Sequence, residues 1–244
     1  HDHCGPNSVI IEPGSGSSEK VRLLLNHLRP KAYVPMDIAA EFLHNAARSL
    51  AQEHPWLQVQ AICADFNQLP KPPQGLPQGR RIVFYPGSTI GNMTPANALA
   101  FLKQLKQWTG NNGGLLIGVD THKCSQTLNA AYNDKRGVTA EFNLNALKNI
   151  NRITGSRFNG DNFKHIAFYN EEQRRIEMHL ECRRDHSVQL GEACITLKKG
   201  ELIHTENSYK YTLDDFSSLA EDAGFKVRRS WFDENQLFGV HFLE

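Results

Sequence analysis

The sequence has few cysteines, and they are scattered along its 244 residues. Five is an odd number, and no two of them form a C-x-x-C pair. This pattern argues against a disulfide framework and against a cysteine-rich zinc site. We therefore expect a reduced, cytoplasmic protein that binds no metal. The five cysteines are Cys4, Cys63, Cys124, Cys182 and Cys194.

Long apolar runs and long charged runs are also missing. No apolar stretch approaches the length that spans a bilayer, and the first residues lack the basic-then-apolar order of a signal peptide. The formal net charge is +1, and the basic clusters at Arg174-Arg175 and residues 226–229 are short. Such clusters are typical of a solvated surface rather than of a nucleic-acid interface. We expect no membrane and no nucleic-acid partner, and the length permits one large or two small domains.

A glycine-containing turn follows the first predicted strand, in the stretch VIIEPGSGSSEK at residues 9–20. Gly14 and Gly16 allow a sharp turn and a close approach to a ligand, and the following helix start suits a carboxylate or phosphate. A dinucleotide fingerprint needs a third glycine where this chain has Glu19. The acidic-x-Gly-x-Gly pattern is instead typical of methyltransferases that use S-adenosylmethionine (SAM), although Ser18 replaces the third glycine often found there. From this stretch alone, a turn that binds nothing remains an alternative.

The apolar pattern predicts strands that alternate with helices, as in a doubly wound parallel sheet. The end of the chain differs, with a helix at 212–223 followed by two strands at 226–231 and 237–242. A terminal hairpin is the ending of class I methyltransferases, whereas a nicotinamide-binding sheet normally adds a sixth parallel strand. The pattern therefore disfavours a nicotinamide-dependent oxidoreductase. The five predicted parallel strands are at residues 9–11, 32–36, 58–63, 81–85 and 115–119.

Polar residues follow several of these strands, at the edge where open α/β sheets bind ligands. Asp37 ends the second strand, where such folds bond the ribose of a nucleotide. It could instead cap a helix at 38–52, and the two roles can coexist. Asp65 and Phe66 follow the third strand and suit an adenine amino group and ring. Residues 86–92, PGSTIGN, follow the fourth strand and are expected to face the reactive end of the cofactor. They differ from the Asn/Asp-Pro-Pro-Tyr/Phe motif of methylases that act on nucleic-acid bases or glutamine side chains.

The pattern changes at residue 122, where polar-rich helical residues 124–155 are followed by short alternating strands. Antiparallel hairpins do not belong to a parallel sheet, so we expect an inserted α+β subdomain. The predicted division is a SAM-binding domain at residues 8–121 and 211–244, with a substrate-binding subdomain at 122–210.

The last strand of the insertion carries a carboxylate and a hydroxyl on one face. Strand alternation places Glu206 with Ser208, and Asn207 with Tyr209 on the opposite face. A carboxylate beside a hydroxyl can hold a polar nitrogenous group. A solvated edge strand would show the same pattern, so both interpretations stay open at this point.

Several longer motifs occur in order over nearly the whole chain, namely EPGSGSSEK, YVPMD, FYPGSTIGN, AAYND, FNLN, FYNEEQRRIEMHL and IHTENSYKY. Together they closely resemble the histidine Nα-methyltransferases of ergothioneine biosynthesis. The resemblance implies a class I, Rossmann-like SAM-methyltransferase sheet with an inserted α+β substrate-binding subdomain. It also implies a monomer that makes hercynine from L-histidine by three methyl transfers, with S-adenosylhomocysteine as the second product.

The same resemblance assigns cofactor contacts to five residues. By the family motifs, Gly14 and Lys20 contact the methionine part of SAM, and Asp37 contacts the ribose. Asp65 and Phe66 then contact the adenine.

The resemblance also implies a substrate site. Asn92 and Tyr132 correspond to residues that hold the α-amino and carboxylate groups of histidine, and both are expected to act in catalysis. Glu206 and Ser208 correspond to the residues that bind the imidazole, which favours the ligand-binding interpretation of Glu206. The remaining expected contacts are Gly87, Thr89 and Met178.

Family members carry several dozen residues before the first strand, where this sequence has eight residues ahead of Val9. That leading segment helps to close the substrate pocket, so we expect it to matter for efficient histidine binding. Two alternative functions follow. One is a related N-methyltransferase for a tryptophan derivative, against which Glu206 and Ser208 argue. The other is a truncated SAM-binding module without efficient turnover.

Overall fold

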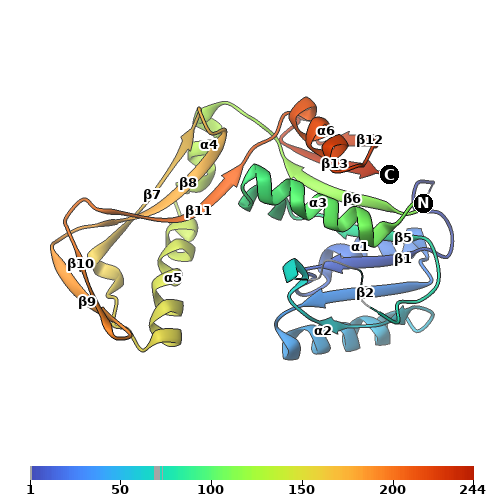
Figure 1. Cartoon of the computed structure of the whole chain (residues 1–244), viewed down its shortest axis with the longest axis horizontal. Helices are drawn as coiled ribbons and strands as arrows, with labels where there is room; N and C mark the ends of the chain where they lie inside the picture. Colours follow the sequence, from blue (N-terminus) through green and yellow to red (C-terminus); the bar gives the residue numbers. More distant parts are fainter. Residues whose placement is uncertain (1, 69–71, 73) are drawn as a thin grey trace. The chain divides into compact units, whose positions relative to one another are not determined.

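The chain forms two compact units in the computed structural model, which describes residues 2–68, 72 and 74–244. The first unit comprises His1–Thr121 and Tyr211–Glu244, and the second comprises His122–Lys210. The ribbon in Figure 1 is coloured along the sequence, so the red C-terminal elements of the first unit can be followed beside its green and blue ones. Each unit has its own sheets and is described separately.

The first unit is built on one mixed sheet with the strand order β12-β13-β6-β5-β1-β2-β3, and β4 also pairs with β2. Neighbouring strands from β6 to β3 are parallel, whereas β13 runs antiparallel to both β6 and β12. This confirms the predicted class I methyltransferase sheet with its antiparallel last strand. The strands are β1 (Val9–Pro13), β2 (Ala32–Asp37), β3 (Gln58–Val59), β4 (Ile62–Cys63), β5 (Arg81–Tyr85), β6 (Gly114–Asp120), β12 (Val227–Phe232) and β13 (Phe238–Leu243).

One strand prediction was wrong in detail. Residues 58–63 form two short strands, β3 and β4, rather than one continuous strand. None of the six side chains is buried, because this segment is at the edge of the sheet. Little apolar burial is therefore available there to hold a regular strand.

Helices of the first unit cover the sheet through apolar side chains. Leu25 and Leu50 pack in one buried cluster with Ile10, Tyr33 and Ile82 of the central strands. None of the helices in the described residues is long and apolar enough to cross a membrane. The helical elements are α1 (Glu19–Leu28), α2 (Ala40–Glu53), η1 (Phe66–Gln68), η2 (Thr89–Asn92), α3 (Pro95–Thr109) and α6 (Leu213–Asp222).

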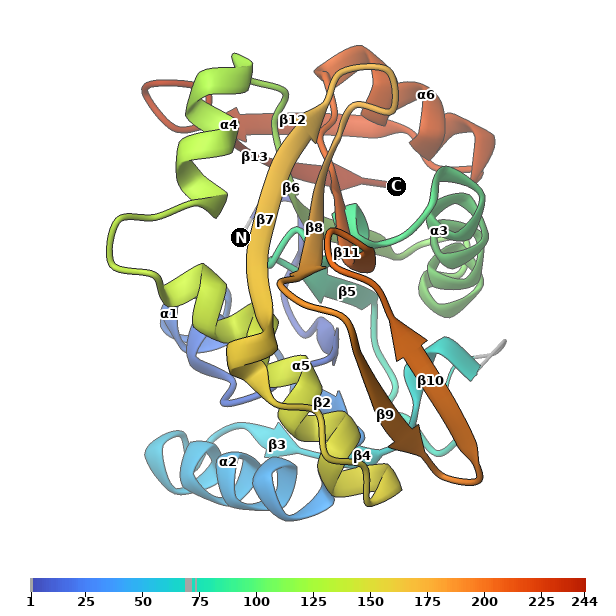
Figure 2. The same ribbon diagram turned by 90° about the vertical axis from the view of Figure 1, so that its left-hand side faces the viewer.

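The second unit has a three-stranded antiparallel sheet in the order β11-β8-β7 and a separate hairpin of β9 and β10, shown in orange tones in Figure 2. The helical stretch 124–155 is divided into two helices, because Gly137 adopts φ 72° and the Asp134 carboxylate accepts the N–H groups of Val138 and Thr139. The elements are α4 (Ser125–Tyr132), α5 (Val138–Thr154), η3 (Gly160–Asn162), β7 (Phe163–Asn170), β8 (Arg175–Cys182), β9 (His186–Leu190), β10 (Ala193–Leu197) and β11 (Leu202–Tyr209).

One face of this three-stranded sheet packs against α4 and α5. Leu128 of α4 packs with Ile176 and Met178 of β8, and Leu147 of α5 packs with Leu180. In the β11–β8 register, Glu206 pairs with Met178 and Ser208 pairs with Ile176. Directly paired residues of neighbouring strands point to the same side of a sheet. Glu206 and Ser208 therefore share this face, as the sequence alternation predicts.

Candidate active site

A pocket of about 260 Å³ opens at the glycine turn of the first unit. It gathers residues from the β1–α1 turn and from the segment that follows β5. Four predicted site residues line it together, namely Gly14, Lys20, Gly87 and Thr89. Its complete lining is Glu12, Pro13, Gly14, Ser15, Gly16, Ser17, Glu19, Lys20, Tyr85, Pro86, Gly87 and Thr89.

The turn needs residues that tolerate a left-handed backbone. Gly14 has φ +67°, and a Cβ added there would meet the Phe66 ring at 3.4 Å. Ser18, at the place of the third family glycine, has φ 57° and is 1% exposed. Its Oγ lies 2.9 Å from the Tyr33 hydroxyl oxygen and donates to it, because the single Tyr33 proton is donated to Glu12. This bond offsets part of the strain of a non-glycine residue in that conformation.

Asp37 ties the end of β2 to the same turn. Its carboxylate accepts the N–H of Gly16 at 3.2 Å and the N–H of Ala39 at 3.1 Å. The alternative that Asp37 caps the following helix was wrong, because α2 begins at Ala40 and Ala39 occupies the cap position. Asp37 holds the glycine turn in place from the carboxyl end of the neighbouring strand.

Asp65 and Phe66 are at the start of η1, which is anchored on α3. Gln104 donates to the Phe66 carbonyl at 2.5 Å, and Gln68 donates to the Asp65 carboxylate at 2.8 Å. The Phe66 ring lies 6.0 Å from the ring of Phe101, measured between centroids. Because the Phe66 ring also lies against Gly14, this segment is brought to the glycine turn.

Glu12 is a buried carboxyl group in the pocket wall, and the sequence analysis gave it no role. Its side chain is 4% exposed, and the Tyr33 hydroxyl donates to it at 2.5 Å. Burial raises the pKa of Glu12 to about 7, although the Tyr33 hydrogen bond and the charge of Lys20 act in the opposite direction. The sequence signal was present, since Glu12 is the acidic residue of the acidic-x-Gly-x-Gly pattern.

The segment after β5 is fixed to β6. Ser88 has φ 56°, and its Oγ accepts the Asp120 N–H at 2.8 Å. A Cβ on Gly118 would lie 2.0 Å from the Pro86 carbonyl oxygen, so only glycine fits this close approach. Asn92 ends η2 with an exposed side chain and is outside the set that lines the pocket.

In the second unit, four further predicted residues lie together. Tyr132, Glu206 and Ser208 form a polar cluster beside the apolar side chain of Met178. The Tyr132 hydroxyl donates to Ser208 Oγ at 2.9 Å, and the Tyr132 side chain packs on the cluster that contains Met178. Met178 is the direct cross-strand partner of Glu206. Burial raises the pKa of Glu206, and the positive charge of Lys210 partly opposes this.

Lys210 is a second functional candidate, after Glu12, to which the sequence analysis gave no role. It is 2% exposed, and its ammonium group donates to Ser208 Oγ at 2.8 Å and to the Tyr132 hydroxyl at 3.0 Å. The signal that could have found it is the same alternation, because Lys210 is two residues beyond Ser208 and four beyond Glu206.

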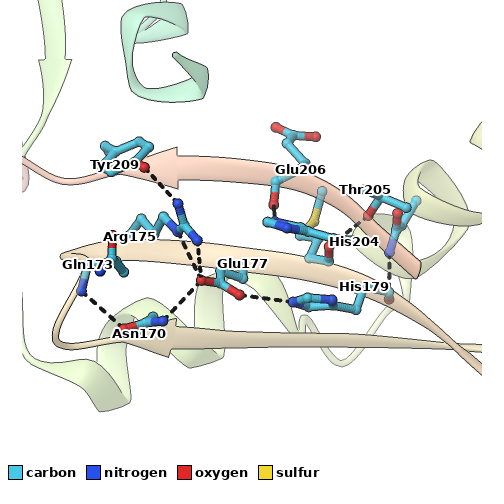
Figure 3. Close-up of polar contacts among 11 residues, drawn as sticks. Asn170, Gln173, Arg175, Glu177, His179, His204, Thr205, Glu206 and Tyr209 are labelled. Carbon is cyan, nitrogen blue, oxygen red and sulfur yellow. Dashed lines mark hydrogen bonds and ion pairs between the residues drawn. The ribbon is translucent and has the colours of Figure 1, made fainter. Parts of the chain in front are cut away.

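The opposite face of the sheet carries a separate charged network (Figure 3). Arg175 and Asn170 both donate to Glu177, which also contacts His179 Nε2 at 3.1 Å. Burial opposes ionisation of Glu177, but these hydrogen bonds outweigh it and lower its pKa. The carboxylate of Glu206 points away from this network.

Three side chains of the network, Glu177, His179 and His204, have potential metal-ligand atoms within 4.8 Å of one another. The two imidazole rings are stacked, with centroids 4.6 Å apart and planes 22° apart. Nearly parallel rings do not direct their in-plane nitrogen lone pairs at one point, and the carboxylate is already held by a guanidinium. We therefore interpret this set as part of the hydrogen-bond network around the Arg175–Glu177 ion pair rather than as a metal site.

Comparisons with known proteins agree with these features. The family described as "Histidine-specific methyltransferase, SAM-dependent" matches residues 2–244. The histidine N-alpha-methyltransferase of Mycolicibacterium smegmatis is 36% identical over 239 residues, which are 95% of this chain and 74% of the relative. The protein of the same name from Mycobacterium tuberculosis is 37% identical over the same shares.

A likeness in fold extends to distant solved structures. A SAM-dependent methyltransferase from Clostridium acetobutylicum superposes with a TM-score of 0.53 at 10% identity, covering 98% of this chain and 84% of the other. At that identity the likeness concerns the fold alone, whereas the family match spans the chain. The chain therefore belongs to the family of histidine-specific, SAM-dependent methyltransferases.

Proposed function

We propose that this protein transfers methyl groups from SAM to the α-amino nitrogen of L-histidine, three times in succession, and so forms hercynine. The observation that carries the proposal is the placement of Glu206 and Ser208 on one sheet face beside Met178 and Tyr132. An imidazole has two ring nitrogens that need polar partners, and this face offers a carboxylate and a hydroxyl. An indole has a single N–H and leaves one of the two partners unpaired.

The pocket of the first unit suits the amino-acid end of SAM. The Lys20 ammonium and the N–H groups at the start of α1 fit its carboxylate, and the buried Glu12 fits a cationic group. Gly14 lines this pocket and lets the Phe66 ring approach the turn. When bound, SAM supplies an electrophilic methyl group on a positively charged sulfur.

The remaining cofactor assignments follow the strand ends. Asp37, already bonded to the glycine turn, is assigned to the ribose hydroxyls. Asp65 is assigned to the adenine amino group and Phe66 to the face of the adenine ring. Their anchoring through Gln68 and Gln104 supports a preformed site.

Catalysis then requires a neutral amine held in line with the departing sulfur. We assign the Asn92 amide oxygen to accept an N–H of the substrate and so orient the nitrogen lone pair. The Tyr132 hydroxyl oxygen, whose proton is donated to Ser208, is assigned to accept an N–H of the same amine. Gly87 and Thr89 are assigned as further substrate contacts. Such positioning can supply much of the rate enhancement of a displacement that needs no covalent help from the enzyme. The third transfer leaves a quaternary nitrogen without a proton or lone pair, so the reaction stops there.

Glu12 should make SAM binding depend on pH. Below about pH 7 the free protein holds a proton on Glu12, and a cationic ligand favours the ionised form. Binding must then release this proton, so SAM affinity should rise up to about tenfold per pH unit between pH 6 and 7. Calorimetry in two buffers of different ionisation enthalpy measures the released proton. Glu12→Gln controls for the ionisation of SAM itself, and an equal pH dependence in both proteins would contradict the role of Glu12.

Mass spectrometry of the reaction products tests the proposed function. The protein is incubated with SAM and L-histidine, with L-tryptophan in a parallel reaction. We expect mono-, di- and trimethylated histidine and little methylated tryptophan. Methylation of tryptophan in preference to histidine, or of neither amino acid, would refute the proposal.

A further inference from the structure

A buried lysine connects two hydroxyl groups of the second unit. Lys210 Nζ lies 2.8 Å from Ser208 Oγ and 3.0 Å from the Tyr132 hydroxyl, and it also lies 5.0 Å from the centroid of the Tyr132 ring. The Tyr132 hydroxyl in turn donates to Ser208 Oγ at 2.9 Å. The three groups form a closed triangle of hydrogen bonds on the face that carries Glu206.

Chemistry determines the direction of the two bonds that Lys210 makes. An ammonium group can only donate, so both hydroxyl oxygens accept from Lys210. Ser208 Oγ accepts a second bond from Tyr132, and a hydroxyl oxygen has two acceptor positions. Both acceptor positions of Ser208 Oγ are therefore occupied, one by Lys210 and one by Tyr132. Within residues 2–68, 72 and 74–244, the structure gives the Ser208 hydroxyl proton no acceptor.

We infer that Lys210 is a positioning residue that fixes Ser208 as a hydrogen-bond donor toward the substrate ring. The inference rests on the proposed function, since it concerns the imidazole assigned to Glu206 and Ser208. With both acceptor positions of Ser208 filled, a ring N–H cannot bond to it. A ring nitrogen without a proton can instead accept a hydrogen bond from the Ser208 hydroxyl.

Glu206 has the opposite hydrogen-bonding role, because it accepts where Ser208 donates. An ionised carboxylate only accepts, so it pairs with a ring N–H. The pair therefore selects a ring with one N–H and one unprotonated nitrogen, which is a neutral imidazole in a single tautomer. A pyrrole ring satisfies Glu206 but offers no acceptor to Ser208. A buried hydroxyl proton left without an acceptor weakens binding.

Ring analogues test this directly in the whole protein loaded with S-adenosylhomocysteine. Calorimetry gives the dissociation constants of L-histidine and of 3-(pyrrol-2-yl)alanine, which has a ring N–H but no ring acceptor. For the unaltered protein we expect histidine to bind about tenfold more tightly, the value of one hydrogen bond. In Lys210→Met the Ser208 hydroxyl is no longer fixed, so the ratio of the two constants should fall toward one. If Lys210 only supports the fold, both constants weaken together and the ratio stays unchanged, which would overturn the inference.

Two more variants keep the test decisive. Ser208→Ala removes the proposed donor and should also bring the ratio near one, whereas an unchanged ratio would overturn the inference. Lys164→Met changes an exposed lysine on β7 and should keep the tenfold ratio. Failure of the unaltered protein to methylate histidine would refute the proposed function. Methylation of histidine without discrimination against the pyrrole analogue would refute the Lys210 inference alone.

Discussion

Replacing Glu206 with glutamine is expected to weaken L-histidine binding about 10- to 100-fold, because a hydrogen bond to a charged group is lost. SAM binding should be unchanged, since the assigned cofactor residues belong to the other unit. Calorimetry with S-adenosylhomocysteine present measures the histidine affinity. In Glu206→Ala, where the side-chain acceptor is also removed, selectivity against tryptophan should relax.

A matched control is available on the same sheet. Glu181 faces the opposite side of β8 from Met178, so Glu181→Gln removes the same charge without touching the polar cluster. Histidine affinity should stay near that of the unaltered protein. An equal loss in both variants would show that net charge, rather than a ring contact, explains the effect. Unchanged affinity in Glu206→Gln would remove Glu206 from the substrate site.

Gly118→Ala is expected to disrupt the segment that carries Gly87, Thr89 and Asn92. A Cβ at Gly118 would lie 2.0 Å from the Pro86 carbonyl oxygen and 2.8 Å from the Phe238 ring. Either β6 or the Pro86 segment must move, and such overpacking costs about 1–3 kcal/mol of unfolding free energy. Because the moved segment carries residues assigned to substrate, kcat should fall by more than the loss of folded protein explains. Thermal unfolding and steady-state kinetics measure the two effects.

Gly160→Ala is the control for this prediction. An added Cβ there meets nothing within 4 Å, so stability and activity should be retained. A stable and fully active Gly118→Ala protein would show that the close contact between β6 and Pro86 is not needed for the site.

The order of strands and helices in the first unit could be predicted because local apolar patterns and turn residues act within short stretches. The capping box of α6, formed by Thr212 and Asp215, was readable in the same way. The partners of β7, β8 and β11 were not readable, because strand pairing depends on contacts distant in sequence. The break in residues 58–63 was also missed, since edge exposure is a tertiary property.

Some residues of the candidate site could also be predicted from local sequence, whereas others depend on contacts between distant residues. Gly14 was within reach because its turn motif is local, and alternation placed Glu206 and Ser208 on one face. The roles proposed for Lys20, Glu206 and Ser208 came from the family resemblance. The conformation of Ser18 could not be predicted locally. Its φ of 57° is accompanied by a hydrogen bond to Tyr33, a side chain of the next strand. Lys210 was within reach of the alternation, but its bonds to Ser208 and Tyr132 needed the packed structure.

The position of the transferred methyl groups tests the central claim most directly. L-Histidine is incubated with the protein and SAM labelled with ¹³C in its methyl group, and the product is examined by NMR. The account predicts a single labelled trimethylammonium signal on the α-nitrogen and unlabelled imidazole nitrogens. Label on an imidazole nitrogen, or no transfer to histidine, would contradict it.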